Sequence, residues 1–283
     1  MLEFGAHAFV WIGDWDTDSG SGAIRDAAAA GCDFIEIPIL EPKSFDAEAH
    51  RKVLEESGLK ATFSTVLPAG SHMPDEPEKA KAYLLAVLDK VAATNSTYLG
   101  GCIGYTLGHL TGAPPAEREI DTIVEVLGEV AREAEERGIT LALEACNRYE
   151  TYVFNSIDDT AAAVRRVGAD NLKVHGDTYH MNIEEEGFYD PIRRNADVLD
   201  YLHMSESHRG LVGTGTVQWN EVWRALKDAN FSGKLALESF AAVNEKLQAA
   251  TCLWRPTNAK PEVLAGEGMK FLRNGAREHG LIT

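Results

Sequence analysis

Four side chains in the second half of the chain have the types and positions that could hold a divalent cation. Three short strand-like runs end in the carboxylates Glu144, Asp177 and Glu238, and a fourth ends in the imidazole of His203. Carboxylates held close together repel one another, so three of them converging on one point require a cation between them. Three oxygens and one nitrogen suit Mn²⁺, Mg²⁺ or Co²⁺ better than a thiolate zinc site does. We therefore expect these four residues to bind one divalent ion, with Mn²⁺ preferred.

Two of these carboxylates end a repeated tetrapeptide. The tetrapeptide Leu-Ala-Leu-Glu occurs at 141–144 and again at 235–238. A single acid at a strand end is commonly a solvated loop carboxylate or a helix cap, so either residue alone indicates little. At equivalent places in two separate strands, Glu144 and Glu238 would approach a bound molecule from opposite sides. The sequence therefore makes them candidates for two groups that act on a bound molecule from both sides.

The elements that must position these residues alternate between short strands and longer helices. Segments with apolar residues at helical spacing follow the strand-like runs, and the alternation occurs eight times. The predicted strands cover residues 3–11, 33–37, 60–66, 97–103, 139–144, 172–177, 198–204 and 234–239. The predicted helices cover residues 22–30, 47–57, 76–93, 116–137, 156–167, 190–195, 219–229 and 262–278.

Capping residues and glycines mark several ends of these helices. The helix starts carry Asp46, Pro77 and Ser156, and the helix ends are followed by Gly31, Gly58, Gly138 and Gly168. Eight strand–helix units without a break in composition predict a single (β/α)8 barrel, one domain over residues 1–283. A doubly wound open sheet is the alternative, but the phosphate-binding fingerprint typical of it is missing. We interpret Gly-Ser-Gly at 20–22 as part of a loop.

Composition and charge argue against several function classes. The formal net charge is −17, which repels phosphate backbones and anionic lipids, so we expect neither a nucleic acid nor a membrane as a partner. No apolar run approaches the roughly 18 residues that a membrane span needs, and the N-terminal segment lacks the basic region of a secretory signal. The four cysteines contain no Cys-x-x-Cys pair, which is typical of a reducing compartment. We expect a cytoplasmic protein.

Motifs around the predicted ligands resemble those of a known enzyme family. They are Leu-Glu-Ala-Cys-Asn-Arg-Tyr-Glu at 143–150, Gly-Asp-Thr-Tyr-His-Met-Asn-Ile-Glu-Glu at 176–185, His-Met-Ser-Glu-Ser-His-Arg at 203–209 and Ala-Leu-Glu-Ser-Phe at 236–240. These segments are similar to the D-tagatose, D-allulose (psicose) and L-ribulose 3-epimerases, which are ketose 3-epimerases of the xylose-isomerase-like barrel superfamily. The resemblance is dense over residues 139–240 and patchy before them.

The resemblance implies the same four metal ligands, and it implies that Glu144 and Glu238 also act as the acid–base pair. It further implies that Glu150, His180 and Arg209 hold the carbonyl end of a ketose. For His180 the plainer interpretation is the start of a short helix, and for Arg209 a loop residue paired with Glu206. The resemblance also places Glu36 near the substrate.

The first half of the chain departs from the family pattern. His7 and Thr106 stand where the relatives carry apolar or tryptophan residues around the distal carbons of the sugar, so His7 is a further candidate for substrate binding. His175 lies two residues before Asp177 and shares its inward side. We interpret His175 as a hydrogen-bonded histidine of the barrel core, with tuning of the site as the alternative.

The activity that the resemblance implies is inversion at C3 of a free ketose. Pairs such as D-fructose and D-allulose, D-tagatose and D-sorbose, or L-ribulose and L-xylulose would interconvert through a cis-enediolate. The metal ion would stabilise the negative charge of the enediolate, and two bases on opposite faces would move the proton. The relatives are dimers or tetramers, which implies a homodimer or a homotetramer here.

Other functions on the same barrel stay open. An aldose–ketose isomerase, a hydroxypyruvate isomerase or an inosose dehydratase would use a similar metal and acid–base core. A metal-dependent endonuclease would need a basic face, which the net charge of −17 opposes. A catalytically silent sugar-binding barrel would not need both Glu144 and Glu238.

Overall fold

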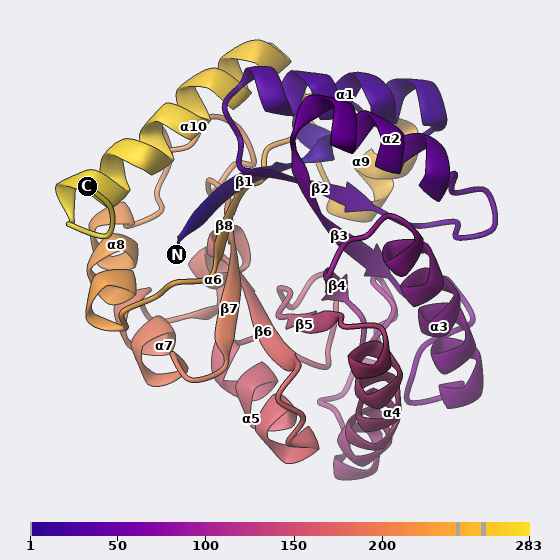
Figure 1. Cartoon of the computed structure of the whole chain (residues 1–283). Helices are drawn as coiled ribbons and strands as arrows, with labels where there is room; N and C mark the ends of the chain where they lie inside the picture. The colour runs from indigo at the N-terminus through magenta and orange to yellow at the C-terminus, as the bar shows by residue number, and fades with distance from the viewer. Residues whose placement is uncertain (1, 242–243, 256–258) are drawn as a thin grey trace.

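The strands close into a parallel barrel in chain order, as the sequence predicts. The computed structural model describes residues 2–241, 244–255 and 259–283, and Figure 1 shows its strands surrounded by a ring of helices. The strands are β1 (Glu3–His7), β2 (Phe34–Pro38), β3 (Lys60–Val66), β4 (Tyr98–Cys102), β5 (Thr140–Glu144), β6 (Leu172–Asp177), β7 (Leu199–Met204) and β8 (Lys234–Leu237). Pairing of β1 with β8 closes the ring. The predicted (β/α)8 barrel is confirmed, and the open sheet is excluded.

The helices fill the connections between strands and cover the outside of the barrel. They are η1 (Ala8–Val10), α1 (Thr17–Ala29), α2 (Ala47–Ser57), α3 (Pro77–Ala93), α4 (Glu117–Glu136), α5 (Ile157–Val167), α6 (Thr178–Glu184), α7 (Tyr189–Arg194), α8 (Trp219–Asp228), α9 (Glu245–Thr251) and α10 (Pro261–Glu278). Asp46 and Ser156 cap α2 and α5 as predicted, because each side chain accepts a backbone N–H in the first turn. Within the described residues, no helix has the length and apolarity that a membrane crossing requires.

The prediction of a loop at residues 20–22 is wrong, because this segment lies inside α1. The side chain of Asp16 accepts the N–H groups of Asp18 and Ser19, and the Ser19 hydroxyl accepts the Asp16 N–H. This reciprocal cap starts the helix five residues before the predicted start at residue 22. Gly20 is needed here because a Cβ would lie 2.6 Å from the Trp15 ring. Close packing, rather than a turn, explains this glycine.

The other boundary differences are small and have local causes. The predicted strand 3–11 ends at His7, because the His7 Nδ1 atom accepts the Phe9 N–H and the chain enters the short helix η1. Helix α6 follows β6 directly and begins where Asp177 accepts the Tyr179 N–H. Neither η1 nor α9 was predicted, and α6 was considered only as the plainer interpretation of His180. All three are short segments for which helical periodicity is a weak guide.

Alternation along the strands produces two layers of side chains inside the barrel. The lower layer, a packed cluster, consists of Phe34, Tyr98, Ala142, Tyr201 and Ala236. Gly5 leaves room for it, since a Cβ there would lie 2.4 Å from the Phe34 ring. Residues two positions further along a strand point to the same side. The upper layer at the carboxyl ends therefore consists of Glu36, Gly100, Glu144, His203 and Glu238, continued by His7 and Asp177, and Cys102 lies two residues further along β4.

Candidate active site

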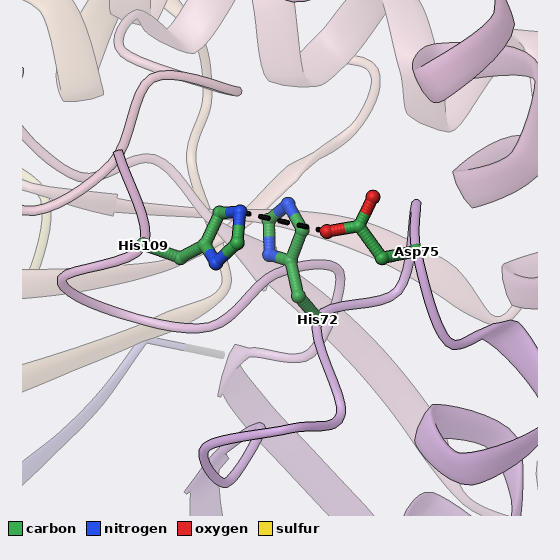
Figure 2. Close-up of side chains that lie close together, drawn as sticks. All are labelled: His72, Asp75 and His109. Carbon is green, nitrogen blue, oxygen red and sulfur yellow. Dashed lines mark ion pairs between the residues drawn. The ribbon is translucent and has the colours of Figure 1, made fainter. Parts of the chain in front are cut away.

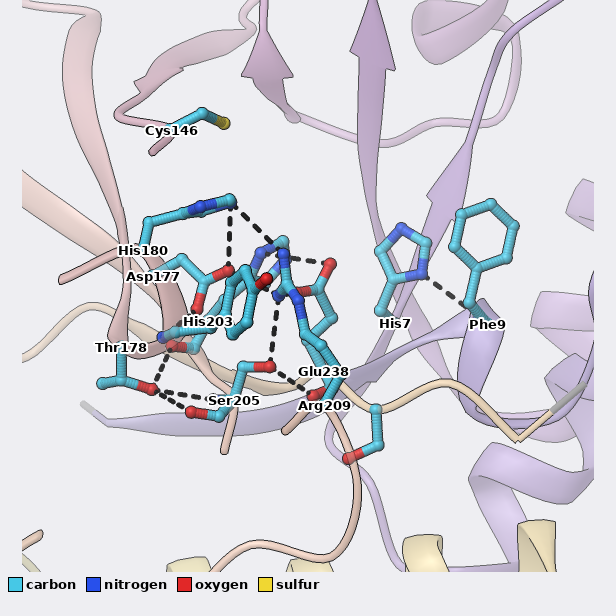
Figure 3. Close-up of polar contacts among 12 residues, drawn as sticks. His7, Phe9, Cys146, Asp177, Thr178, His180, His203, Ser205, Arg209 and Glu238 are labelled. Atoms are coloured by element: carbon cyan, nitrogen blue, oxygen red, sulfur yellow. Dashed lines mark hydrogen bonds and ion pairs between the residues drawn. The ribbon is translucent and has the colours of Figure 1, made fainter. Parts of the chain in front are cut away.

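The four predicted metal ligands lie together at the carboxyl end of the barrel, and all are buried. The Nδ1 atom of His203 is 3.5 Å from an oxygen of Glu144 and 3.5 Å from an oxygen of Glu238. One guanidinium nitrogen of Arg209 is 2.6 Å from Asp177 and also contacts Glu238. Figure 3 shows Asp177, His203, Arg209 and Glu238 meeting at this point. Adjacent strands thus deliver the residues to one place, as expected for a barrel.

The electrostatics of this cluster favour a bound cation. Burial raises the pKa of Glu144, and burial with repulsion from Glu238 raises the pKa of Asp177 to about 6 although Arg209 opposes it. Burial lowers the pKa of His203, but Glu238 and Glu36 outweigh it and leave the pKa well above its usual value. A divalent cation would relieve the repulsion among these carboxylates.

The orientation of His203 fits a metal ligand. Its Nε2 atom is 2.7 Å from the Glu36 carboxylate, and its buried Nδ1 atom has no hydrogen-bond partner among the described residues. A carboxylate behind a ligating histidine fixes the ring and raises its basicity, leaving the other nitrogen free for the metal. The donor set of three carboxylates and this imidazole therefore fits a hard divalent ion.

Glu36 lies behind His203 in addition to lining the cavity. Its Oε2 atom accepts a hydrogen bond of 2.6 Å from the Tyr201 hydroxyl as well as contacting His203. Burial raises the pKa of Glu36, but His203 and His7 outweigh it, and the net pKa lies well below the usual range. These contacts orient the Glu36 carboxylate toward His203 and Tyr201, and substrate contact by Glu36 stays a prediction.

His180, Glu150 and Arg209 line one wall of the cavity. The Asn147 backbone N–H donates to His180 Nδ1 over 3.1 Å, and the Asn147 side chain donates to Glu150 over 2.9 Å. Because Asn147 N–H groups point at Nδ1, the neutral His180 ring carries its proton on Nε2, which lies 3.5 Å from an Asp177 oxygen. In this tautomer Arg209, which can only donate, makes no hydrogen bond to Nε2. Asn147 therefore orders two candidate substrate ligands. Its place in the motif at 143–150 was visible in the sequence, but its contacts were not.

Arg209 adopts a left-handed backbone conformation, with φ of 59°, which a non-glycine residue adopts only at a cost of roughly 1–3 kcal/mol. Its backbone N–H donates to the Glu206 carbonyl, while its side chain turns into the site. The Glu206 carboxylate instead accepts the N–H groups of Ser207, Gly213 and Val217. The side-chain pairing of Arg209 with Glu206 is thus excluded.

A cavity of about 500 Å³ opens above the cluster and includes both His7 and Glu150 in its lining. The His7 Nε2 atom is 3.4 Å from the Ser64 hydroxyl and 3.6 Å from Glu36. Burial lowers the pKa of His7 to about 4, so the ring is neutral near pH 7. Leu107 belongs to the cavity lining, whereas Thr106 is turned away and its N–H donates to His72.

His175 is a buried residue of the barrel interior, as expected, but its ring makes packing contacts and not the expected hydrogen bonds. Its ring packs against those of His203 and Tyr201, with centroids 4.2 and 4.6 Å away. Neither ring nitrogen has a hydrogen-bond partner within the described part of the chain, so the expected hydrogen bonding is wrong. Burial lowers its pKa well below the usual value. The ring is therefore uncharged and packs against His203.

A second group of potential ligands lies on the loops at the rim. Figure 2 shows the His72 and His109 rings stacked, with His109 paired to Asp75 at 3.5 Å. Both His72 nitrogens are already engaged, because Nδ1 accepts the Thr106 N–H and Nε2 lies 3.2 Å from the Tyr152 hydroxyl. This group joins three loops and offers no free His72 nitrogen to a metal.

Comparison with known proteins places the chain in a family. A family model described as xylose isomerase-like TIM barrel matches residues 24–275. The chain is 35% identical to L-ribulose 3-epimerase from Methylomonas sp. (strain DH-1), over 96% of this chain and 97% of that one. It belongs to the ketose 3-epimerases of the xylose isomerase-like TIM barrel family. Epimerases are isomerases, so the predicted family and enzyme class are confirmed.

Other ketose 3-epimerases show similar agreement. The Ketose 3-epimerase of Arthrobacter globiformis is 33% identical over 96% of each chain. The crystal structure of D-allulose 3-epimerase from Methylomonas sp. in complex with D-allulose superposes with a TM-score of 0.93, at 35% identity and 96% coverage of each chain. The resemblance therefore extends over nearly the whole barrel, including the first half, where the motifs alone were patchy.

Proposed function

We propose that this chain is a metal-dependent ketose 3-epimerase that inverts C3 of a free ketose through a cis-enediolate. The observation that carries the proposal is the placement of Glu144 and Glu238. Each has an oxygen 3.5 Å from the same His203 nitrogen, yet they reach it from β5 and β8, with β6 and β7 between. Two carboxylates on opposite flanks of one point can serve opposite faces of a carbon atom.

The proton transfers belong to these two glutamates. One accepts the C3 proton from the first face, and the other donates a proton to the second face. A single base returns the proton to the side it came from, so inversion needs both. Burial raises the pKa of Glu144, which makes this carboxylate a stronger base than an exposed one.

The metal site consists of Glu144, Asp177, His203 and Glu238, and we propose Mn²⁺ first, with Mg²⁺ and Co²⁺ as alternatives. A bound divalent ion would supply the Lewis acidity that stabilises the enediolate charge. Glu36 holds the His203 ring in the required orientation through its 2.7 Å contact with Nε2. Tyr201 in turn donates to Glu36, which keeps this carboxylate in place.

The cavity wall next to the cluster binds the carbonyl end of the sugar. Arg209 donates to O2, where negative charge develops, and His180 Nε2–H donates to O1 or O2. Glu150 accepts from the O1 hydroxyl, and Asn147 fixes both His180 and Glu150. His7 and Ser64 offer neutral hydrogen-bonding groups on the first half of the barrel. Charged groups at one end of the cavity and uncharged hydrogen-bonding groups at the other suit an uncharged polyhydroxy ketose such as D-allulose, D-fructose, D-tagatose or L-ribulose.

Isotope exchange tests the proposal directly. The metal-loaded protein is incubated in D₂O with D-fructose, D-tagatose, L-ribulose or erythrulose, and deuterium is located by NMR. Exchange at C3 with formation of the C3 epimer is the expected result. Exchange at C1 instead would indicate an aldose–ketose or hydroxypyruvate isomerase. In a separate incubation with an inosose, loss of water would indicate a dehydratase.

We further propose a homodimer or homotetramer. Trp254 is 71% exposed and Leu110 is 52% exposed, which are large apolar side chains to leave in water. Light scattering on the purified protein is expected to give two or four times the mass of 30.9 kDa. A monomer at micromolar concentration would contradict this proposal and leave the catalytic one untouched.

A further inference from the structure

Two buried cysteines form a dithiol pair on the cavity wall beside Glu144. Cys102 ends β4, and Cys146 follows β5 by two residues. Their sulfur atoms are 3.5 Å apart, and each side chain is 2% exposed. Both residues line the cavity, so a small solute in the cavity can reach the pair. The reaction proposed above uses neither thiol.

The spacing of the two sulfurs suits a shared metal ion. With metal–sulfur bonds of about 2.3 Å, two thiolates on one tetrahedral ion lie roughly 3.8 Å apart. The observed 3.5 Å needs a movement of only a few tenths of an ångström to match. A disulfide would instead require the sulfurs to close to about 2.05 Å. The pair is therefore nearer to the geometry of a chelate than to that of a covalent bridge.

Oxygen and nitrogen donor atoms lie close to the two cysteine sulfurs. A carboxylate oxygen of Glu144 is 4.0 Å from the Cys102 sulfur, and donor atoms of Cys102, Glu144 and Cys146 all lie within 4.8 Å of one another. Cys146 also forms such a group with Glu150 and His180, and Figure 3 shows its thiol on the side of His180 away from Asp177. Four-coordinate sites built from two thiolates and harder donors are typical of zinc and its heavier relatives.

We propose that Cys102, Cys146 and Glu144 form a second metal site, selective for thiophilic divalent cations such as Zn²⁺ and Cd²⁺. The two donor sets share Glu144, so the sites compete for one carboxylate. Hard ions select the oxygen-rich set, and thiophilic ions select the dithiol. Occupancy of the dithiol site withdraws Glu144 from proton transfer and inhibits the enzyme. Only this inhibition rests on the proposed function, because binding itself needs the two thiols and the Glu144 carboxylate but no catalysis.

Cadmium provides a readout that is independent of activity. Cd²⁺ is titrated into the reduced protein with a non-thiol reductant present, and the thiolate-to-cadmium charge-transfer absorption is followed in the ultraviolet. Cd²⁺ on the carboxylate set gives no such band, so the signal reports thiolate ligation. The expected result is a band that saturates at one thiolate-bound Cd²⁺ per chain, with parallel loss of epimerase activity.

Matched cysteine variants locate the signal. Cys102→Ser and Cys146→Ser should each lose most of the band, whereas Cys252→Ser, at an exposed thiol, and Cys32→Ser, at a buried remote one, should keep it. Because even outer-shell partners are worth roughly 10–100-fold in metal affinity, Glu144→Gln should weaken Cd²⁺ binding by at least about tenfold. Circular dichroism checks that each variant is folded.

Three outcomes overturn the proposal: no band in the reduced parent, a band that survives in the Cys102→Ser/Cys146→Ser double variant, or a band lost in Cys252→Ser. Failure here is distinct from failure of the proposed function. A protein that epimerises ketoses with Mn²⁺ but shows no band refutes only the dithiol site. A protein that shows the band without epimerase activity refutes only the epimerase.

Discussion

The two halves of the barrel bring different kinds of side chain to the same level. In the second half, β5, β6 and β7 supply Glu144, Asp177 and His203, and Glu238 follows β8 directly. In the first half, β1 to β4 place His7, Glu36, Ser64 and Cys102 in the lining of the same cavity, and Glu36 contacts His203 and Tyr201. The second half thus carries the predicted metal ligands. The first half carries uncharged hydrogen-bonding groups and Glu36, which contacts His203. We infer that the second half performs the chemistry and the first half fits the substrate.

The largest predicted effect comes from the proton-transfer pair in the second half. Glu144→Gln and Glu238→Gln should each lower kcat by about 10²–10⁴-fold, because an amide cannot accept the C3 proton. Steady-state kinetics on D-allulose and L-ribulose with saturating Mn²⁺ measure the change. Glu125→Gln, at an exposed position on α4, is the control that should keep full activity. Near-native turnover in either active-site variant rules out a two-base mechanism.

The next effect concerns the loop that carries Arg209. The Glu206 carboxylate accepts N–H groups from Ser207, Gly213 and Val217 and from the Trp219 indole. Burial raises its pKa, but these donors outweigh burial and leave the pKa below its usual value. Since hydrogen bonds to charged groups are worth about 1.5–3 kcal/mol each, Glu206→Gln should lower the free energy of unfolding by roughly 3 kcal/mol at pH 7.

The sign of the pH dependence follows from this lowered pKa. A depressed folded-state pKa contributes stability that is present above the unfolded value of about 4.3 and is lost as pH falls through the folded value. Denaturant unfolding of wild type and Glu206→Gln at several pH values measures the difference. The gap should be constant from pH 7 to about 5.5 and should narrow below about 4.3. A gap that widens in acid contradicts the assignment.

A substitution at Glu36 tests whether a residue of the first half positions the metal ligand His203 in the second half. Glu36→Gln should weaken Mn²⁺ binding by about 10–100-fold, because it removes the charge that orients His203 and raises its basicity. Calorimetric titration of metal-free protein measures affinity without reference to turnover. Glu41→Gln, an exposed residue of the cavity lining, is the matched control. If metal affinity is unchanged while KM for the sugar rises, Glu36 contacts substrate and the positioning role is wrong.

The smallest effect is expected at His7, in the first half of the barrel, which we infer to fit the substrate. His7→Phe removes one neutral hydrogen-bonding group, which is worth about 0.5–1.5 kcal/mol and corresponds to a roughly 2–10-fold rise in KM. The change should fall on KM more than on kcat and should differ among four-, five- and six-carbon ketoses. A loss of kcat comparable to that of Glu144→Gln would contradict the inference that the first half fits the substrate and only the second half performs the chemistry.

The sequence predicted the barrel and the location of the charged cluster because both follow from short-range patterns. A carboxylate at the end of a parallel strand reaches the same rim wherever it occurs, so Glu144 and Glu238 could be brought together from their place in the alternation alone. The start of α1 was predicted incorrectly, because glycine propensity hid a reciprocal cap between Asp16 and Ser19.

Contacts between distant strands were beyond the reach of sequence patterns. The orientation of His203 depends on Glu36, 167 residues away, and the Cys102–Cys146 pair spans 44 residues. The roles of Asn147 and Glu206 depend on rotamers and loop shape. Such features are set by packing across the barrel, which periodicity and spacing do not encode.

The central claim is that Glu144, Asp177, His203 and Glu238 share one divalent ion. Anomalous diffraction from crystals grown with Mn²⁺, collected on both sides of the manganese absorption edge, tests this most directly. We expect one strong peak per chain within bonding distance of His203 Nδ1 and of an oxygen from each carboxylate. A peak elsewhere, or full occupancy of that point by the Arg209 guanidinium at saturating Mn²⁺, would contradict it.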